Sequence, residues 1–410
     1  MALRRGLHVA ARSHPLRWAG VLTLVIVAVG FQLKRSVPDP VVHLAMATTA
    51  AALPGAAPAL PWPVTGQAAV AVPGRGLFLA SGPESPVPIA SLTKIMTAYL
   101  VLRDHPLSPT AEGPTVVMSD ADRDEAALDE EADASSVPVQ PGEVLSERQL
   151  LNGLLVHSAN NFADVLANWD RGSLAAFVAQ MNSAASALGM KETHYADTSG
   201  LSPQSVSSAG DQLRVAVAAM AIPAFAVMVD QTSVTLPIAG VIPNYVSSVG
   251  TDGIVGVKSG FTQAAMGCLV MAADREVDGR NVMVMAAVTG QPGLKPLDAA
   301  NTADTALVDA AAHALHERPV LSRSAVAATV GLPWRSDGVA AATGRGVTLL
   351  AWPGDDVQMT FTPKHLRNGA PAGTLVGTLE VSDGSQHVSV PVRTTAPLPT
   401  ASLSWRLKRR

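Results

Sequence analysis

A serine and a lysine three residues apart, Ser91 and Lys94, are the pair in this sequence best suited to nucleophilic catalysis. A serine hydroxyl attacks a carbonyl only when a base takes its proton. On a helix, residues three apart project from the same face, so the lysine amine can lie beside the hydroxyl. The amine acts as a base only if burial or a neighbouring cation lowers its pKa. This pair therefore predicts acyl transfer through a serine ester.

A second motif, Ser158-Ala159-Asn160, interrupts two apolar segments of helical spacing. The Ser158 hydroxyl is suited to passing a proton to a leaving nitrogen, and the Asn160 amide is suited to holding a substrate carbonyl. An oxyanion needs preorganised donors as well. The backbone N–H groups of Ser91 and Phe261 are the candidates.

A third motif, Lys258-Ser259-Gly260, lies in a segment of strand character. Lys258 and Ser259 can bind a free carboxylate through charge and a hydroxyl. Lys258 is also a candidate for the cation that lowers the pKa of Lys94. Gly260 lets a substrate backbone approach the strand edge closely. The three motifs together predict an acyl-transfer enzyme for substrates with a free carboxylate.

The order and wording of these motifs resemble the low-molecular-mass penicillin-binding proteins, specifically the serine D-alanyl-D-alanine carboxypeptidases. The resemblance is strong over roughly residues 65–292 and looser beyond. The segments that carry it are Ser91-Leu92-Thr93-Lys94-Ile95-Met96-Thr97-Ala98, Leu154-Leu155-Val156-His157-Ser158-Ala159-Asn160-Asn161, Met181-Asn182 followed by Leu188-Gly189-Met190, Thr193, Ser199-Gly200-Leu201 and Gly256-Val257-Lys258-Ser259-Gly260-Phe261-Thr262.

The resemblance implies a hydrolase that removes the terminal D-Ala from peptidoglycan stem peptides ending in D-Ala-D-Ala, and that β-lactams inhibit covalently. It implies Ser91 as the nucleophile, Lys94 as its base, Ser158 as a proton relay, and Lys258 with Ser259 as the carboxylate site. No cofactor and no metal is expected. The sequence departs from the family in having Ser259 where threonine is usual, which keeps the hydroxyl.

Three alternatives share parts of this pattern. A β-lactamase of class A uses a glutamate on a loop between the second and third motifs. In the corresponding stretch the only glutamate is Glu192, in a Lys-Glu-Thr setting unlike that loop. A DD-endopeptidase that cuts crosslinks and a non-hydrolytic sensor of β-lactams or wall peptides remain as further alternatives.

The elements that must position these motifs follow from periodicity. The resemblance implies an α/β fold: a penicillin-binding/β-lactamase-like domain with an antiparallel sheet, flanking helices and a helical subdomain, and the β runs after Pro319 predict a small C-terminal all-β domain. Predicted strands cover 68–72, 76–80, 256–260, 268–273, 282–289, 347–351, 357–361, 374–381 and 386–392, and predicted helices cover 91–103, 147–169, 173–188 and 302–316. Residues 119–133 hold eight acidic side chains and predict a solvated loop or an exposed helix.

The same reading divides the chain into five parts. Residues 1–35 are a cytoplasmic stub with a membrane anchor or signal segment, and 36–63 are a Pro/Ala-rich linker. Residues 64–317 form the catalytic domain, 318–398 the small β domain and 399–410 a basic tail.

The N-terminal segment carries arginines before an uncharged run, Trp18 to Leu33, and Lys34 and Arg35 after it. This pattern suits a signal peptide or a membrane span. We favour a single-pass anchor that places the catalytic domain on the extracytoplasmic side, and a secreted protein if the segment is cleaved near Ala45-Met46-Ala47. The net charge of −4 gives no global basic field for nucleic acid. The single cysteine, Cys268, is expected in the core.

Overall fold

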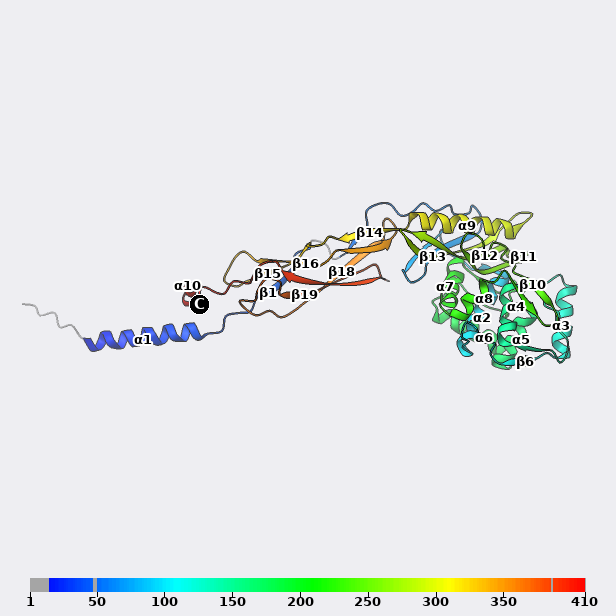
Figure 1. Ribbon diagram of the computed structural model, residues 1–410, viewed down its shortest axis with the longest axis horizontal. Helices are drawn as coiled ribbons and strands as arrows, with labels where there is room; N and C mark the ends of the chain where they lie inside the picture. Colours follow the sequence, from blue (N-terminus) through cyan, green and yellow to red (C-terminus); the bar gives the residue numbers. More distant parts are fainter. Residues whose placement is uncertain (1–14, 47–49, 385, 410) are drawn as a thin grey trace, which may run out of the picture.

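The computed structural model describes residues 15–46, 50–384 and 386–409, which form an elongated molecule (Figure 1). A catalytic domain of helices and strands lies at one end. An extended β domain follows, and an N-terminal helix, α1 (Pro15–Lys34), lies at the other end. The mixed α/β architecture with a second, all-β domain confirms the predicted fold class.

An antiparallel five-stranded sheet organises the catalytic domain, in the order β11-β12-β13-β3-β4. Its strands are β3 (Gln67–Val72), β4 (Leu77–Ala80), β11 (Ile254–Thr262), β12 (Met266–Val277) and β13 (Arg280–Gln291). All five strands lie where the periodicity predicts them, although β4 is one residue shorter and the other four are longer. Alternate residues point to opposite faces, so both faces are apolar and each has its own buried cluster. The sheet is therefore a central layer, and β11 is one of its two edges.

Helices cover both faces of this sheet (Figure 1). One long helix, α9 (Pro296–Ala314), packs against one face, chiefly on β12 and β13. The other face carries the helical subdomain, made of α2 (Thr93–Asp104), α3 (Asp120–Glu131), α4 (Glu147–Val156), α5 (Asn160–Arg171), α6 (Leu174–Ala187), α7 (Ala209–Met220) and α8 (Pro223–Val229). Short antiparallel pairs brace it: β5 (Val87–Pro88) with β8 (Val206–Ser207), β6 (Thr115–Val117) with β7 (Val144–Ser146), and β9 (Ser233–Leu236) with β10 (Gly240–Pro243).

Two helix predictions need correction. The single helix expected over residues 147–169 is two helices, α4 and α5, with a break at 157–159. Ser158 there has φ +64°, a left-handed conformation that an α-helix does not accommodate. The helix expected from Thr302 begins instead at Pro296, whose fixed φ suits a first helical turn. The acidic segment forms the helix α3, capped by Ser119.

The β domain has one seven-stranded sheet in the order β1-β15-β16-β20-β19-β18-β2. Its strands are β1 (Val41–Leu44), β2 (Ala50–Ala52), β15 (Val326–Gly331), β16 (Val339–Thr343), β18 (Asp356–Pro363), β19 (Leu375–Ser382) and β20 (His387–Thr394), and beside it β14 (His316–Leu321) pairs with β17 (Val347–Ala351). The four C-terminal β runs predicted from sequence are all strands. Aliphatic side chains from the sheet and from β14 and β17 form its buried core.

The linker predicted over residues 36–63 contains two of these strands instead. Val41 pairs with Gly331, and Ala51 pairs with Val357, so β1 and β2 occupy the two opposite edges of the sheet. Pro and Ala are common in flexible tethers, but short strands at sheet edges tolerate nearby prolines because half of their backbone groups face solvent. The N-terminal segment is thus bound to the β domain along both of its edges.

The last helix of the described chain meets the C-terminal end of α1. The basic tail forms α10 (Leu403–Lys408), which packs against α1. Arg406 and Arg409 donate hydrogen bonds to the last carbonyl oxygens of α1 and the residues after it, those of Gln32, Leu33, Arg35 and Ser36. Carbonyls at a helix C-terminus lack intrahelical donors, so two guanidinium groups are well placed there. Within the described residues, no unbroken helix is both long and apolar enough for a membrane span, and the apolar part of α1 runs from Trp18 to Lys34.

We predict that β1 and β2 contribute directly to the stability of the β domain. A protein that begins at residue 53 lacks both strands, whereas one that begins at residue 36 keeps them. The shorter protein should lose a few kcal/mol of unfolding free energy, at about 1 kcal/mol for each lost backbone hydrogen bond. It should also aggregate through its open edges. Thermal unfolding with light scattering measures both effects, and equal melting temperatures would contradict the pairing.

Candidate active site

Ser91 lies in a tight turn that leads into α2. A 3-10 helix over Ala90–Leu92 continues directly into α2, and Ala90 has φ +47°. Ser91 is half-buried, whereas the residues around it, among them Ala90 and Leu92, are buried. The turn therefore holds the Ser91 hydroxyl at the surface of a rigid core. Lys94 follows one turn later on the same helix face, as the spacing predicts.

Lys94 is fully buried, and its amine has three partners. Its Nζ lies 2.9 Å from Ser91 Oγ, 2.7 Å from Asn160 Oδ1 and 2.8 Å from the carbonyl oxygen of Ser199. A neutral amine has two N–H donors and one lone pair. The Asn160 Oδ1 and the Ser199 carbonyl oxygen can only accept, so they take the two donors and leave the lone pair for the Ser91 hydroxyl. This geometry is what a general base needs.

The electrostatic surroundings favour that neutral form near physiological pH. Burial lowers the pKa of Lys94 from its ordinary value of 10.5 to about 7. The negative charges of Asp197, Asp129 and Asp164 act in the opposite direction and keep the value from falling further. With a pKa near the working pH, a large fraction of the Lys94 amine is unprotonated, and the amine is still basic enough to accept the Ser91 proton.

Asn160 reaches Lys94 from the break between α4 and α5, which also holds Ser158. Asn160 is the first residue of α5, and its backbone N–H donates to the carbonyl oxygen of Ser135. Ser158, 3% exposed, precedes it in the left-handed conformation already noted. The break lets the Asn160 amide turn toward α2, where its Oδ1 accepts the Lys94 hydrogen bond. The sequence indicates an interruption between two apolar segments at this motif, but not the left-handed backbone of Ser158.

Strand β11 forms the opposite side of the site. A Cβ added at Gly260 would lie 2.8 Å from the backbone nitrogen of Ser91, so this strand passes directly against the nucleophile turn. Only glycine permits that approach. Phe261, the second oxyanion candidate, follows at the same strand edge with an exposed side chain. The third motif and the first, which are far apart in sequence, therefore meet in space.

Lys258 is fully buried on β11, and Ser259 beside it is 5% exposed. The Lys258 ammonium group donates to the carbonyl oxygen of Ser259 at 2.9 Å. Burial is the main cause that lowers the pKa of Lys258 well below 10.5, and the charge of Lys94 adds to it. The charge of Lys94 thus acts on Lys258, whereas the pKa of Lys94 is set by burial and by three carboxylates. An effect of Lys258 on Lys94 stays a prediction.

The loop over residues 197–202, for which the sequence predicts no catalytic role, contacts Lys94. Ser199 supplies the carbonyl oxygen that accepts the Lys94 bond, and the Asp197 carboxylate binds the backbone N–H groups of Gly200 and Ser202. Gly200 has φ +85°, and a Cβ there would lie 1.9 Å from the carbonyl oxygen of Ala90. The segment Ser199-Gly200-Leu201 resembles the family in sequence, but only the structure shows that it contacts the turn that holds Ser91.

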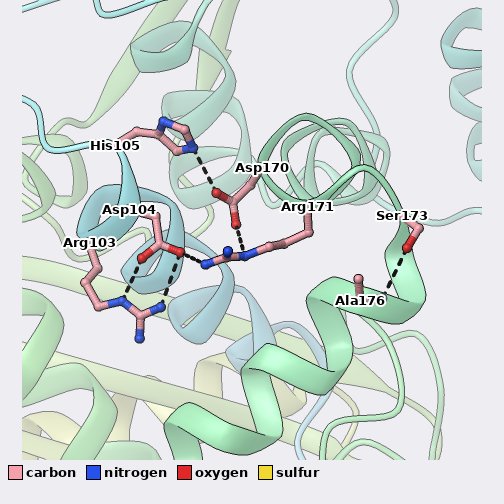
Figure 2. Close-up of polar contacts among 7 residues, drawn as sticks. All are labelled: Arg103, Asp104, His105, Asp170, Arg171, Ser173 and Ala176. Atoms are coloured by element: carbon pink, nitrogen blue, oxygen red, sulfur yellow. Dashed lines mark hydrogen bonds and ion pairs between the residues drawn. The ribbon is translucent and has the colours of Figure 1, made fainter.

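The helices that carry Lys94 and Asn160 are joined again at their far ends (Figure 2). Asp104 at the end of α2 pairs with Arg171 at the end of α5 and with its neighbour Arg103. His105 Nε2 lies 2.8 Å from Asp170, which also pairs with Arg171. The Lys94–Asn160 bond joins the N-terminal ends of the same two helices. Fastening at both ends limits sliding between α2 and α5.

Two other residues of interest lie outside the reacting groups. His157 stacks on Tyr245, with ring centroids 4.4 Å apart, and its Nδ1 lies 3.2 Å from the carbonyl oxygen of Pro243. These contacts give it a structural role beside the second motif. Cys268 is buried, and burial raises the pKa of its thiol to about 12. In the part of the chain that the structure describes, no cluster of three His, Cys, Asp or Glu side chains is suited to hold a metal ion.

We predict that Gly200→Ala slows acylation of Ser91 by penicillin at least about tenfold, because its Cβ must push the loop away from Ala90 and Lys94. The matched control is Gly189→Ala, where φ is +72° but nothing lies within 4 Å of the added Cβ. Stopped-flow fluorescence with a labelled penicillin measures both rates. Equal slowing in the two variants would assign the effect to backbone strain alone.

Comparison with known proteins agrees with this geometry. Residues 67–291 match the profile of the S11 peptidases, described as D-alanyl-D-alanine carboxypeptidases. A D-alanyl-D-alanine endopeptidase of Pseudomonas aeruginosa is 35% identical over 243 residues, 56% of this chain and 74% of the relative. The carboxypeptidase DacB2 of Mycobacterium tuberculosis is 33% identical over 204 residues, which cover 48% of this chain and 65% of the relative. The crystal structure of DacD from Francisella tularensis aligns with a TM-score of 0.59 at 20% identity, over 84% of this chain and 95% of that one. The chain belongs to the S11 family of D-alanyl-D-alanine carboxypeptidases.

Proposed function

We propose that this protein is a serine D-alanyl-D-alanine carboxypeptidase that trims peptidoglycan stem pentapeptides through an ester on Ser91. The observation that carries the proposal is the buried Lys94 amine between the Ser91 hydroxyl, Asn160 and the Ser199 carbonyl. Family membership supplies the substrate class.

Acylation begins when Ser91 Oγ attacks the carbonyl carbon of the penultimate D-Ala. Its proton passes to Lys94 Nζ, which lies 2.9 Å away. The developing oxyanion takes hydrogen bonds from the backbone N–H groups of Ser91 and Phe261. The C–N bond then breaks, and the leaving D-Ala nitrogen receives a proton through Ser158. This step leaves an acyl-Ser91 ester and free D-Ala.

Deacylation repeats the sequence with water. Lys94 takes a proton from the attacking water, and the ester bond to Ser91 Oγ breaks as the serine recovers its proton. The products are a stem tetrapeptide and the free enzyme. Atoms and charge balance over the two steps, since one peptide bond and one water give a carboxylate and an amine.

The free carboxylate of the substrate is the group that Lys258 and Ser259 are suited to bind. The buried Lys258 gains a counter-charge when a carboxylate enters, so binding raises its pKa. A charged Lys258 in turn disfavours a charged Lys94, because the two amines influence each other. Substrate binding therefore helps to keep the base neutral, which couples recognition to catalysis.

Endopeptidase activity is a second candidate, because the relative from Pseudomonas aeruginosa carries that name. Both reactions use the same acyl-enzyme and differ in the leaving amine. The residues around Lys94 and Glu192 argue against a β-lactamase of class A, which uses a glutamate to hydrolyse its acyl-enzyme. The partners of Lys94 are an asparagine, a serine hydroxyl and a backbone carbonyl, and Glu192 instead donates its backbone N–H to Asp211.

For the N-terminal helix we propose a role as a membrane anchor that leaves the catalytic domain on the extracytoplasmic side. Apolar side chains of α1 are exposed over most of its length, among them Leu24 at 71% and Phe31 at 71%. Such exposure is unfavourable in water and favourable in a bilayer. Lys34 lies at the end of the helix, where a long cationic side chain can reach the lipid headgroups.

We predict that acylation by penicillin requires the neutral Lys94 amine. With a pKa of about 7, the acylation rate should be constant above that pH and fall below it, to about a hundredth at pH 5. Lys94→Arg keeps a cation that never releases its proton, so it should abolish acylation while circular dichroism shows an intact fold. A rate independent of pH between 5 and 8 would exclude Lys94 as the base.

The carboxypeptidase itself is tested by incubating the full-length protein with a muropeptide pentapeptide and with a crosslinked muropeptide dimer. We expect stoichiometric D-Ala release from the pentapeptide and its loss in Ser91→Ala. Faster cleavage of the dimer than of the pentapeptide would instead identify an endopeptidase. Nitrocefin hydrolysis provides the control for β-lactamase activity and should stop after about one turnover.

A further inference from the structure

A cavity of about 710 Å³ opens beside the catalytic groups and has no part in the chemistry described above. Its walls are the first half of α6, the loop 194–201 and Asp164 of α5. Leu174 and Val178 of α6 and Leu201 of the loop make one side apolar. Asp164 makes the other side acidic. A cavity with an apolar wall and a carboxylate at one end suits an aliphatic chain that ends in a cation.

The cavity adjoins the reacting centre through a shared wall. Ser199 lines it and also supplies the carbonyl oxygen that accepts the Lys94 bond. Gly200, between Ser199 and Leu201, presses against the Ala90 carbonyl oxygen next to the nucleophile. A ligand in the cavity is therefore separated from Ser91 by little more than one loop.

Within the described residues no arginine or lysine forms an ion pair with Asp164, the carboxylate on the acidic side of the cavity, although the charge of Lys94 reaches it. The ion pairs of the acidic helix α3 join Arg123 to Asp120 and Asp124, on its exposed face. On its other face, Glu125 hydrogen-bonds Asp164. Asp164 accepts one further hydrogen bond, from Thr198 Oγ1.

Glu125 and its neighbours carry an excess of negative charge. Burial, the hydrogen bond with Asp164 and the charges of Asp164 and Asp129 together raise the pKa of Glu125 to about 8. A cation beside these clustered carboxyl groups would gain a favourable interaction with their negative charge. In the described chain, Asp129 Oδ2 is also buried without a hydrogen-bond partner. An ammonium group beside Asp164 would compensate this charge.

We propose that this cavity binds the side chain of the third stem-peptide residue, a diamino acid, with its aliphatic part against Leu174, Val178 and Leu201 and its free ammonium at Asp164. The inference rests on the proposed function and adds a selectivity to it. A stem whose side-chain amine is free fits the acidic end, whereas a stem whose amine is acylated in a crosslink brings a neutral amide there. The enzyme should therefore prefer stems that have not served as crosslink acceptors.

Two peptides test the proposal on the full-length protein: acetyl-L-Lys-D-Ala-D-Ala with a free ε-amine, and the same peptide acetylated on that amine. We expect the ratio of their kcat/KM values to favour the free amine about tenfold, the usual size of one charge-assisted hydrogen bond. Asp164→Asn should bring this ratio close to one. Any change of the Lys94 pKa in that variant acts on both peptides and cancels in the ratio.

A matched control and a second variant test whether the effect of Asp164→Asn comes from the cavity. Glu130→Gln removes the same charge from the exposed face of α3 and should leave the ratio as in the unmodified protein. Leu174→Lys, at an exposed position on the opposite wall, places a competing ammonium in the cavity and should also abolish the preference. His194 lines the cavity too, so every assay is run at one pH.

The outcomes separate the two proposals. D-Ala release at equal kcat/KM from both peptides in the unmodified protein overturns the subsite and leaves the carboxypeptidase standing. A preference that survives both Asp164→Asn and Leu174→Lys also overturns the subsite. Absence of D-Ala release from either peptide overturns the proposed function and the subsite with it.

Discussion

The burial of one amine is the constraint on which the rest of the site depends. A lysine in water holds its proton at pH 7 and cannot activate a hydroxyl. Lys94 is enclosed by an asparagine, a backbone carbonyl and the serine it serves, and removal from water lowers its pKa to about 7. Burial of a polar group is unfavourable unless its hydrogen bonds are satisfied. The surrounding elements supply those hydrogen-bond partners, which offset the free-energy cost of burying the amine.

Each neighbouring element can be understood as a partner to that amine. The break after α4 brings Asn160 to it, the Asp197-stabilised loop brings a carbonyl, and β11 brings a second buried lysine. The far ends of α2 and α5 are tied by Asp104 and Arg171 (Figure 2). Small shifts between these elements would expose the Lys94 amine to water. Fastening the helices away from the reaction therefore protects the protonation state of Lys94.

Much of this arrangement could be predicted from residue types and spacing. The three motifs, the sheet strands and the C-terminal β runs have local signals, because each depends on a turn or a period of a few residues. The interruption at Ser158 has a sequence signal, but its left-handed backbone could not be predicted, since a serine rarely adopts that conformation. The role of Ser199 was hidden for a different reason: it acts through a backbone carbonyl, which every residue type possesses. The strands in residues 36–63 were also missed, because their partners are distant in sequence.

Those two short strands have a consequence for the order in which the chain folds. β1 and β2 are synthesised before the catalytic domain, whereas the strands that they border, β15 and β18, are synthesised after it. Pairing must wait until nearly the whole polypeptide has emerged, and closure of so long a loop carries a large entropic cost. The catalytic domain can mature first as an insert. The β domain is then completed last, so a chain that stalls before its C-terminus holds a mature enzyme on an unfinished support.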